Sequence, residues 1–207
     1  MNSPIEAEST RLLDAVRSLL LAKNVTTPQE IAERIRITDA ASPAQGARMV
    51  AKAWCDPKYR ALMLADGTKA AEALGIAMRG APPLGVLEDT GELHNLVVCT
   101  LCSCYPRAVL GYPPFWFKSA AYRARAVRDP RGVLAEWGTV LPEATRVRVV
   151  DSTADYRWMV LPLRPAGTED WPEERLAALV REGDMIGVTL PDRLAVTRPG
   201  AAAGPAS

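Results

Sequence analysis

The first 78 residues carry apolar side chains at helical spacing. One amphipathic stripe has members one, three and four positions apart: Leu12, Leu13, Val16, Leu19 and Leu20. Thr27-Pro28-Gln29-Glu30 predicts a helix start, with an N-cap, a first-turn proline and a capping-box carboxylate. Ser42-Pro43 and Asp56-Pro57 repeat the cap-plus-proline pattern before two further helices. The pattern predicts a helical N-terminal arm over residues 1–79.

Beyond residue 80 the pattern changes from helices to a mixture of strands and short helices. The stretch Gly80–Gly85 cannot continue a helix, because proline lacks the backbone donor and glycine lacks conformational restraint. Apolar, β-branched and aromatic runs predict strands at Leu96–Val98, Arg146–Asp151, Tyr156–Leu161 and Met185–Leu190. Helix start and stop signals predict short helices at Ala120–Val127, Pro130–Trp137 and Pro172–Arg181.

The order of these elements indicates an α+β fold with a helical N-terminal arm. We expect the arm at residues 1–79, a metal-binding catalytic α/β domain at 80–197 and a disordered tail at 198–207. The tail consists mainly of Ala, Gly and Pro and has no residue that would form a core. The apolar stripe of the arm needs a surface to bury against, and a second subunit is a natural candidate.

Composition and charge exclude several classes of function. With 25 basic and 24 acidic residues among 207, no overall field favours nucleic acid or acidic lipid. The basic run from Arg123 to Arg131 is expected to be a solvated or interface-facing helix surface. Leu19–Ala22 is too short to span a bilayer, and the N-terminal residues are too charged for a secretory signal. We therefore expect a cytoplasmic protein with no nucleic-acid or membrane partner.

Three of the four cysteines, Cys99, Cys102 and Cys104, lie within six residues. Three thiols cannot pair off as disulfides without leaving one over, whereas soft sulfur donors in one short loop suit a thiophilic metal. Zinc with His94 as a fourth ligand is one alternative. If all three sulfurs converge on one ion, the amides of Ser103 and Cys104 come close to it, which favours Co(III) or Fe(III).

The segment Val97–Pro106, written VVCTLCSCYP, resembles the metal-binding segment of nitrile hydratase α subunits. The resemblance covers roughly residues 45–191, and further matching segments are Val50–Pro57, His94-Asn95, Val109–Pro114, Tyr122–Arg131, Val160–Glu169 and Asp184–Gly187. It implies a layered α-β-β-α domain for the catalytic part of the chain. It also implies a lyase that hydrates a nitrile to the amide, in a heteromer with a nitrile hydratase β-type subunit.

The family's metal ligands carry over to this loop residue by residue. They would be the sulfurs of Cys99, Cys102 and Cys104 and the deprotonated backbone amides of Ser103 and Cys104, around a low-spin Co(III) or, alternatively, Fe(III). Thr100 resembles the cobalt-type members, which favours cobalt. Cys102 would be oxidised to a sulfinate and Cys104 to a sulfenate, so that Cys104 and Ser103 are the catalytic residues. The nucleophile is either a water activated by the ion or the sulfenate oxygen.

The sequence departs from the family beside this loop, where Arg107-Ala108 replaces the usual Trp-Pro. Arg107 is therefore expected to bind substrate, in a pocket for a polar or bulky nitrile, unless it points outward or pairs at a subunit interface. The γ subunit of thiocyanate hydrolase, a relative with arginine here, is an alternative identity, since a cation near the metal would suit an anionic substrate. A non-catalytic metal-binding module is a further alternative.

Two other residues are assigned structural roles. Cys55 lies in a helical stretch and is expected to be a small core residue. His94 is expected to order the strand before the cysteines through hydrogen bonds.

Overall fold

The computed structural model describes residues 4–192, and the side chains from residue 8 onward. The described part of the chain forms, in order, α1 (Pro4–Ala22), α2 (Pro28–Ala40), α3 (Pro43–Cys55), α4 (Pro57–Ala65), α5 (Gly67–Ala73), β1 (Leu84–Glu88), β2 (Leu93–Val98), α6 (Arg107–Leu110), α7 (Phe115–Lys118), α8 (Ala120–Arg128), α9 (Pro130–Glu136), β3 (Arg146–Asp151), β4 (Arg157–Leu161), α10 (Glu173–Ala177) and α11 (Glu182–Ile186). The tail expected to be disordered, 198–207, lies outside the described residues.

The chain divides into two units, residues 1–40 and 41–207. In the first unit the capping box at the start of α2 forms as expected: the Thr27 N–H donates to the Glu30 carboxylate over 2.8 Å, and the Glu30 N–H donates to the Thr27 hydroxyl over 3.2 Å. The apolar stripe of α1 is exposed along its length, at Leu12, Leu13, Val16, Leu19 and Leu20. This unit therefore presents an apolar helix face.

The boundary between the units differs from the expected one at residue 80. Residues 41–79 belong with the strands, because α4 and α5 pack on β1 and α3 packs on α6 and α11. The Leu84 N–H at the start of β1 donates to the Thr68 hydroxyl of α5 over 2.9 Å. The proline-rich stretch at 80–85 is a turn inside the second unit and ends at a strand that the sequence pattern did not predict.

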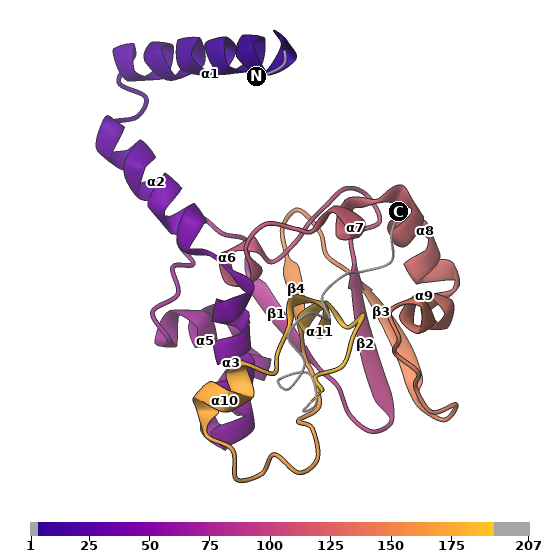
Figure 1. Ribbon diagram of the computed structural model, residues 1–207. Coiled ribbons are helices and arrows are strands. Elements are labelled where there is room, and N and C mark those ends of the chain that lie inside the picture. Colours follow the sequence, from indigo (N-terminus) through magenta and orange to yellow (C-terminus); the bar gives the residue numbers. More distant parts are fainter. Residues whose placement is uncertain (1–3, 193–207) are drawn as a thin grey trace. The chain divides into compact units, whose positions relative to one another are not determined.

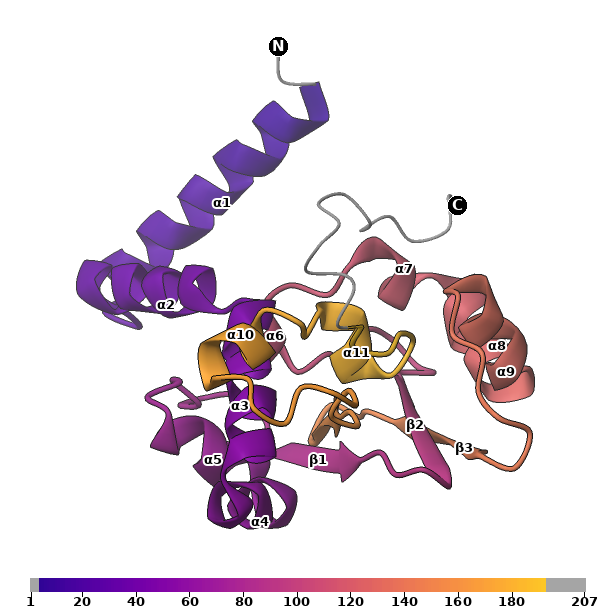
Figure 2. The ribbon, with the colours of Figure 1, turned by 60° about the horizontal axis from the view of Figure 1, so that its bottom comes forward.

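The second unit is built around two parallel strand pairs. β1 pairs with β4 in the register Leu84↔Arg157 to Glu88↔Leu161. β2 pairs with β3 in the register Leu93↔Arg146 to Val98↔Asp151. Figures 1 and 2 show α3, α4, α5 and α10 beside β1, and α8 and α9 beside β2 and β3. The mixed α+β class expected from the sequence is confirmed.

The core of the second unit lies between these strands and the helices that flank them. Met49 and Val50 of α3, Leu96 of β2 and Met159 of β4 are all fully buried. On the opposite flank, Tyr122 of α8 is also buried, and its hydroxyl donates to the Val97 carbonyl over 2.6 Å. The helices on both flanks thus hold β2 in place, including the end that leads into the cysteines.

Residues Met185–Leu190 do not form the expected last strand. Glu182–Ile186 is the helix α11, which ends at Gly187 with φ 87°. Asp184 accounts for the difference: its buried carboxylate accepts the Arg181 N–H over 2.8 Å and the Thr189 hydroxyl. The consecutive apolar residues of this segment fit a buried helix as well as a strand. The expected helix at Pro172–Arg181 is present in a shorter form, α10.

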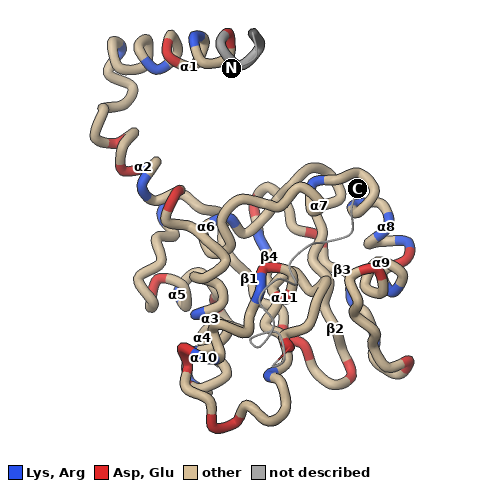
Figure 3. The backbone as a smooth tube through the Cα atoms, viewed as in Figure 1, with Lys and Arg blue, Asp and Glu red and all other residues tan. Residues whose placement is uncertain are grey.

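Surface charges are locally paired. In α8, Arg125 forms ion pairs with Glu136 at 2.7 Å and Asp129 at 3.8 Å. Figure 3 shows basic and acidic positions close to one another at α8 and α9. No described helix has both the length and the apolar character needed to cross a membrane.

His94 orders the N-terminal half of β2, as expected. Its buried ring lies 3.0 Å from the Asp89 carboxylate through Nδ1 and 2.7 Å from the Gly187 carbonyl through Nε2. Since both neighbours are acceptors, the ring is held best when both nitrogens carry protons. Burial opposes the charged form, but Asp89 and Gly187 outweigh it and raise the pKa of His94 above its ordinary value.

Stability should therefore fall as the pH rises. The His94–Asp89 ion pair contributes fully below the unfolded pKa of about 6.5, and its contribution is lost as the pH rises through the higher folded pKa. His94→Gln should cost roughly 3 kcal/mol of unfolding free energy at low pH and flatten this decline. Urea unfolding of the parent protein and of His94→Gln at a series of pH values measures how the unfolding free energy depends on pH. Equal slopes for the two proteins would contradict the assignment.

Gly187 is expected to tolerate no side chain. A Cβ there would lie 1.9 Å from the Asn95 carbonyl oxygen, whereas at Gly138, which has a similar φ of 78°, it would meet nothing within 4 Å. Gly138→Ala should therefore cost only the backbone strain, about 1 kcal/mol. Gly187→Ala should cost at least about 3 kcal/mol, because the backbone of β2 must move as well. Thermal unfolding compares Gly138→Ala with Gly187→Ala. Similar melting temperatures for the two variants would refute the close approach of residue 187 to the Asn95 carbonyl.

Candidate metal centre

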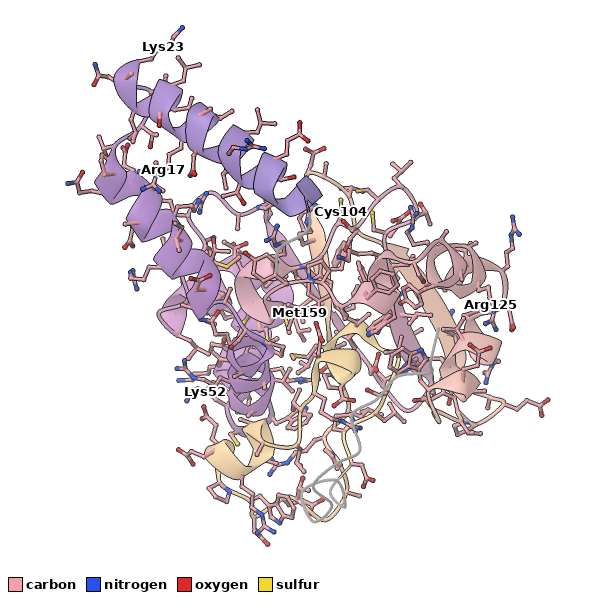
Figure 4. The ribbon with its side chains drawn as sticks, turned by 45° about the horizontal axis from the view of Figure 1, so that its top comes forward. Arg17, Lys23, Lys52, Cys104, Arg125 and Met159 are labelled. Atoms are coloured by element: carbon pink, nitrogen blue, oxygen red, sulfur yellow. The ribbon has the colours of Figure 1, made fainter. Side chains whose placement is uncertain are left out.

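The candidate metal centre lies in the loop Cys99–Cys104, called the cysteine loop below, which follows β2 directly. Val98 is the last residue of β2 and is in register with Asp151, the last residue of β3. Because the two strands are parallel, their carboxyl ends meet at one edge, where polar groups from distant parts of the sequence gather. Figure 4 shows Cys104 at this edge of the second unit, whereas Met159 lies in its interior.

The three sulfurs of the loop converge. Cys99 Sγ lies 3.6 Å from Cys102 Sγ, which lies 3.2 Å from Cys104 Sγ. All three lie within 4.8 Å of one another, and each cysteine is free. Two sulfurs on one ion, with bonds of about 2.3 Å, lie at most about 4.6 Å apart, so the observed spacing fits a shared ion. Among the described residues this is the single His/Cys/Asp/Glu group with such convergence.

The pKa values of Cys102 and Cys104 are shifted in opposite directions. Burial raises the pKa of Cys104 to about 12. Hydrogen bonds from Cys104 and Cys99, and from the backbone N–H groups of Ser103 and Cys104, hold the pKa of Cys102 below its ordinary value. Cys102 is exposed, whereas Cys99 and Cys104 are buried. A metal ion bound by all three sulfurs would have to displace the thiol protons, because the thiolate is the form that binds a metal.

The backbone around Ser103 faces the sulfurs. The N–H groups of Ser103 and Cys104 both lie against Cys102 Sγ, and the Cys102 N–H donates to Cys99 Sγ over 3.3 Å. Three soft sulfurs with two adjacent amide nitrogens form a compact mixed N/S donor set. The metal-ligand atoms that are close together in the sequence are thus also adjacent in the structure.

Arg107 begins α6, three residues after Cys104. Its side chain is exposed and its guanidinium lies over the ring of Tyr112, 4.4 Å from the ring centre. The flat face of the guanidinium is therefore occupied by an aromatic ring of its own loop, while its edge still carries N–H donors.

Neither Cys55 nor His94 is near the cysteine loop as a further ligand. Cys55 ends α3 and is exposed, so the expectation of a small core residue is wrong: the last turn of α3 turns this position to solvent. His94 uses both ring nitrogens on Asp89 and Gly187. The zinc alternative with His94 as fourth ligand therefore loses its ligand.

Several polar residues around the loop were not found from the sequence. Asp151, Arg123 and Glu182 each hydrogen-bond a residue of the loop or its flank. Arg157, at the start of β4, carries a buried Nη1 with no hydrogen-bond partner among the described residues, and its charge acts on Cys104. These residues lie 19 to 78 positions from Cys104 in the sequence. Of these residues, only Asp151 could have been suspected from the sequence, because it ends a predicted strand.

Curated relatives resemble the chain over most of its length. It is 47% identical over 178 residues to the low-molecular weight cobalt-containing nitrile hydratase subunit alpha of Rhodococcus rhodochrous, covering 86% of each chain. The cobalt-containing nitrile hydratase subunit alpha of Pseudonocardia thermophila is 45% identical over 89% of this chain and 91% of its own. The thiocyanate hydrolase subunit gamma of Thiobacillus thioparus is 42% identical over 86% of this chain and 77% of its own.

Solved structures give the same grouping. A recombinant thiocyanate hydrolase with partially modified cobalt centres matches with a TM-score of 0.83 and 40% identity, over 93% of this chain and 92% of that chain. A double mutant of the Fe-type nitrile hydratase from Comamonas testosteroni matches with a TM-score of 0.79 and 42% identity, over 97% of both chains.

The family described as "Nitrile hydratase, alpha chain" matches residues 7–189. This match spans both units and includes the whole cysteine loop. The chain belongs to the nitrile hydratase α-chain family.

Proposed function

We propose that the chain is the metal-binding, catalytic subunit of a nitrile hydratase, a lyase that hydrates a nitrile to the amide. The observation that carries the proposal is the convergence of the three sulfurs, at 3.6 and 3.2 Å, with two backbone N–H groups against the middle one. The ligands would be the sulfurs of Cys99, Cys102 and Cys104 and the backbone nitrogens of Ser103 and Cys104.

Cobalt(III) is the proposed ion, with iron(III) as the alternative. Thr100 stands where cobalt-type members have threonine, and two of the relatives above are named as cobalt-containing nitrile hydratases. When bound, the ion would supply Lewis acidity that makes the nitrile carbon open to attack. The thiolates would be oxidised in place by an external oxidant such as dioxygen, Cys102 to the sulfinate and Cys104 to the sulfenate.

The residues of this chain place and shield the reacting groups. Burial of Cys104 keeps its oxygen, once formed, in surroundings of low polarity where a nucleophile is poorly solvated. Ser103 contributes through its backbone nitrogen beside Cys102. Cys104 and Ser103 are thus the proposed catalytic residues of the loop.

A β-type subunit is the proposed partner, in a heteromer with a small-molecule nitrile as substrate. The outer side of the loop is open: Leu101 is 88% exposed, and Cys102 beside it is exposed as well. The apolar stripe of α1 offers a second surface that a partner would bury. A cytoplasmic location remains our prediction, because thiols such as these stay reduced there until a metal binds.

Arg107 is the proposed substrate-binding residue. With its face on Tyr112, its N–H edge is left to hydrogen-bond a polar group, which suits a polar or bulky nitrile better than a small apolar one. The same cation also favours a second candidate function, hydrolysis of thiocyanate, since the chain is 42% identical to a thiocyanate hydrolase subunit.

Metal analysis and intact mass test the centre. The chain co-expressed with its partner subunit and loaded with cobalt should hold one cobalt and gain the mass of about three oxygens, two on Cys102 and one on Cys104. Cys104→Ala, which keeps two of the three sulfurs, should lower cobalt content severalfold. Cys55→Ala is the matched control and should change neither quantity. Zinc bound without oxidation would refute the proposed centre.

A substrate panel tests the reaction. The same preparation should form amides from polar nitriles, measured by chromatography. Arg107→Trp should shift the ratio of kcat/KM toward apolar nitriles by about tenfold or more, because a charged donor is replaced by an apolar wall. Release of carbonyl sulfide from thiocyanate, with no amide from any nitrile, would instead establish the second candidate.

A further inference from the structure

Thr100 at one end of the cysteine loop is held through each of its polar groups. Its backbone N–H donates to Asp151 Oδ1 over 3.0 Å, and its hydroxyl donates to Asp151 Oδ2. Its carbonyl accepts from Arg123 Nη1 over 3.3 Å. Asp151 can reach it because the register of β2 and β3 sets Asp151 opposite Val98. A single carboxylate therefore fixes both the direction and the position of the chain as it leaves β2.

Tyr105 holds the other end. Its hydroxyl donates to Glu182 Oε1, on the first turn of α11. Its ring is buried and packs edge-to-face on Phe117 at 5.0 Å between centroids. A second carboxylate, from a different element, thus fixes the chain as it enters α6.

Only residues 101–104 lie between these two anchors, and Leu101 among them is almost fully exposed. A segment this short with both ends fixed has few conformations, so little entropy is lost when its sulfurs come together. Metal centres need ligands preplaced by surrounding hydrogen bonds, because small displacements weaken binding.

We propose that Asp151 and Glu182 are positioning residues that clamp the two ends of the cysteine loop and so bring its three sulfurs together. They act through Thr100 and Tyr105 and touch neither the sulfurs nor the substrate in this role. The proposal rests on the proposed function only in that the sulfurs are taken to hold a metal.

Hydrogen–deuterium exchange on the metal-free full chain tests the clamp without any metal. Asp151→Ala should speed exchange of the amides in residues 99–105 about five- to tenfold, since the acceptor of the Thr100 N–H is lost. Asp151→Asn keeps one acceptor at the same place and should restore most of the protection. Thr100→Val should have an intermediate effect, and combined with Asp151→Ala it should add little.

Glu182 gives the matched pair for the other end. Glu182→Gln keeps an acceptor for the Tyr105 hydroxyl, so the amides of residues 99–105 should exchange within about twofold of the parent rate. In Glu182→Leu the same amides should exchange roughly tenfold faster. Glu136→Gln, which breaks the exposed ion pair with Arg125, is the control and should leave the loop unchanged. If Asp151→Ala and Glu182→Leu leave loop exchange at the parent rate, the clamp is refuted.

Cobalt retention gives an independent reading. Loaded Asp151→Ala and Glu182→Leu should lose cobalt to a chelator at least about fivefold faster than the parent and the Asn and Gln variants, with an altered visible spectrum. Variants that lose thermal stability but keep the parent's loop exchange, cobalt retention and spectrum would show a merely structural role. A parent that holds cobalt but forms no amide would overturn the proposed function and leave the clamp intact.

Discussion

The parallel register of β2 and β3 is the constraint on which the cysteine loop depends. It sets Val98 opposite Asp151, so a loop that leaves β2 finds a carboxylate at its second residue. A shift of one residue would turn Asp151 to the other face of the strand pair and leave Thr100 without its acceptor. The register is in turn held at the other end of β2, where the His94–Asp89 pair and the Asn95 bond to Arg148 at 2.7 Å lock the strand.

The sulfurs that this constraint brings together form an arrangement that is unfavourable without a cation. Cys102 Sγ lies 3.6 Å from Cys99 Sγ and 3.2 Å from Cys104 Sγ, and burial raises the pKa of Cys104 to about 12. Asp151 and Glu182 hydrogen-bond the two ends of the loop, and the charge of Arg157 acts on Cys104. A trivalent ion would displace the thiol protons and bind the three sulfurs, which already lie close together.

The sequence was informative where chemistry is local and uninformative where it depends on distant contacts. The spacing of Cys99, Cys102 and Cys104 predicted their convergence, and the capping box at Thr27 predicted the start of α2. Strand β1 was not predicted because its run follows two prolines and contains a glycine. Met185–Leu190 was predicted as a strand from its apolar run, whereas the helix at Glu182–Ile186 depends on the buried Asp184. The carboxylates that hold the loop come from β3 and α11, so no local pattern links them to the cysteines.

In the proposed function, the residue that binds substrate lies outside the loop that would hold the metal. Relatives named as nitrile hydratases and as thiocyanate hydrolase share this chain's fold at 40% identity or more, so the loop alone does not separate them. Arg107 lies just outside the segment between Thr100 and Tyr105, on the first turn of α6, where its exposed guanidinium stacks on Tyr112 and contacts none of the three sulfurs in the described hydrogen bonds. If Arg107 binds substrate as proposed, a substitution there would change the substrate while the cysteine loop keeps its geometry.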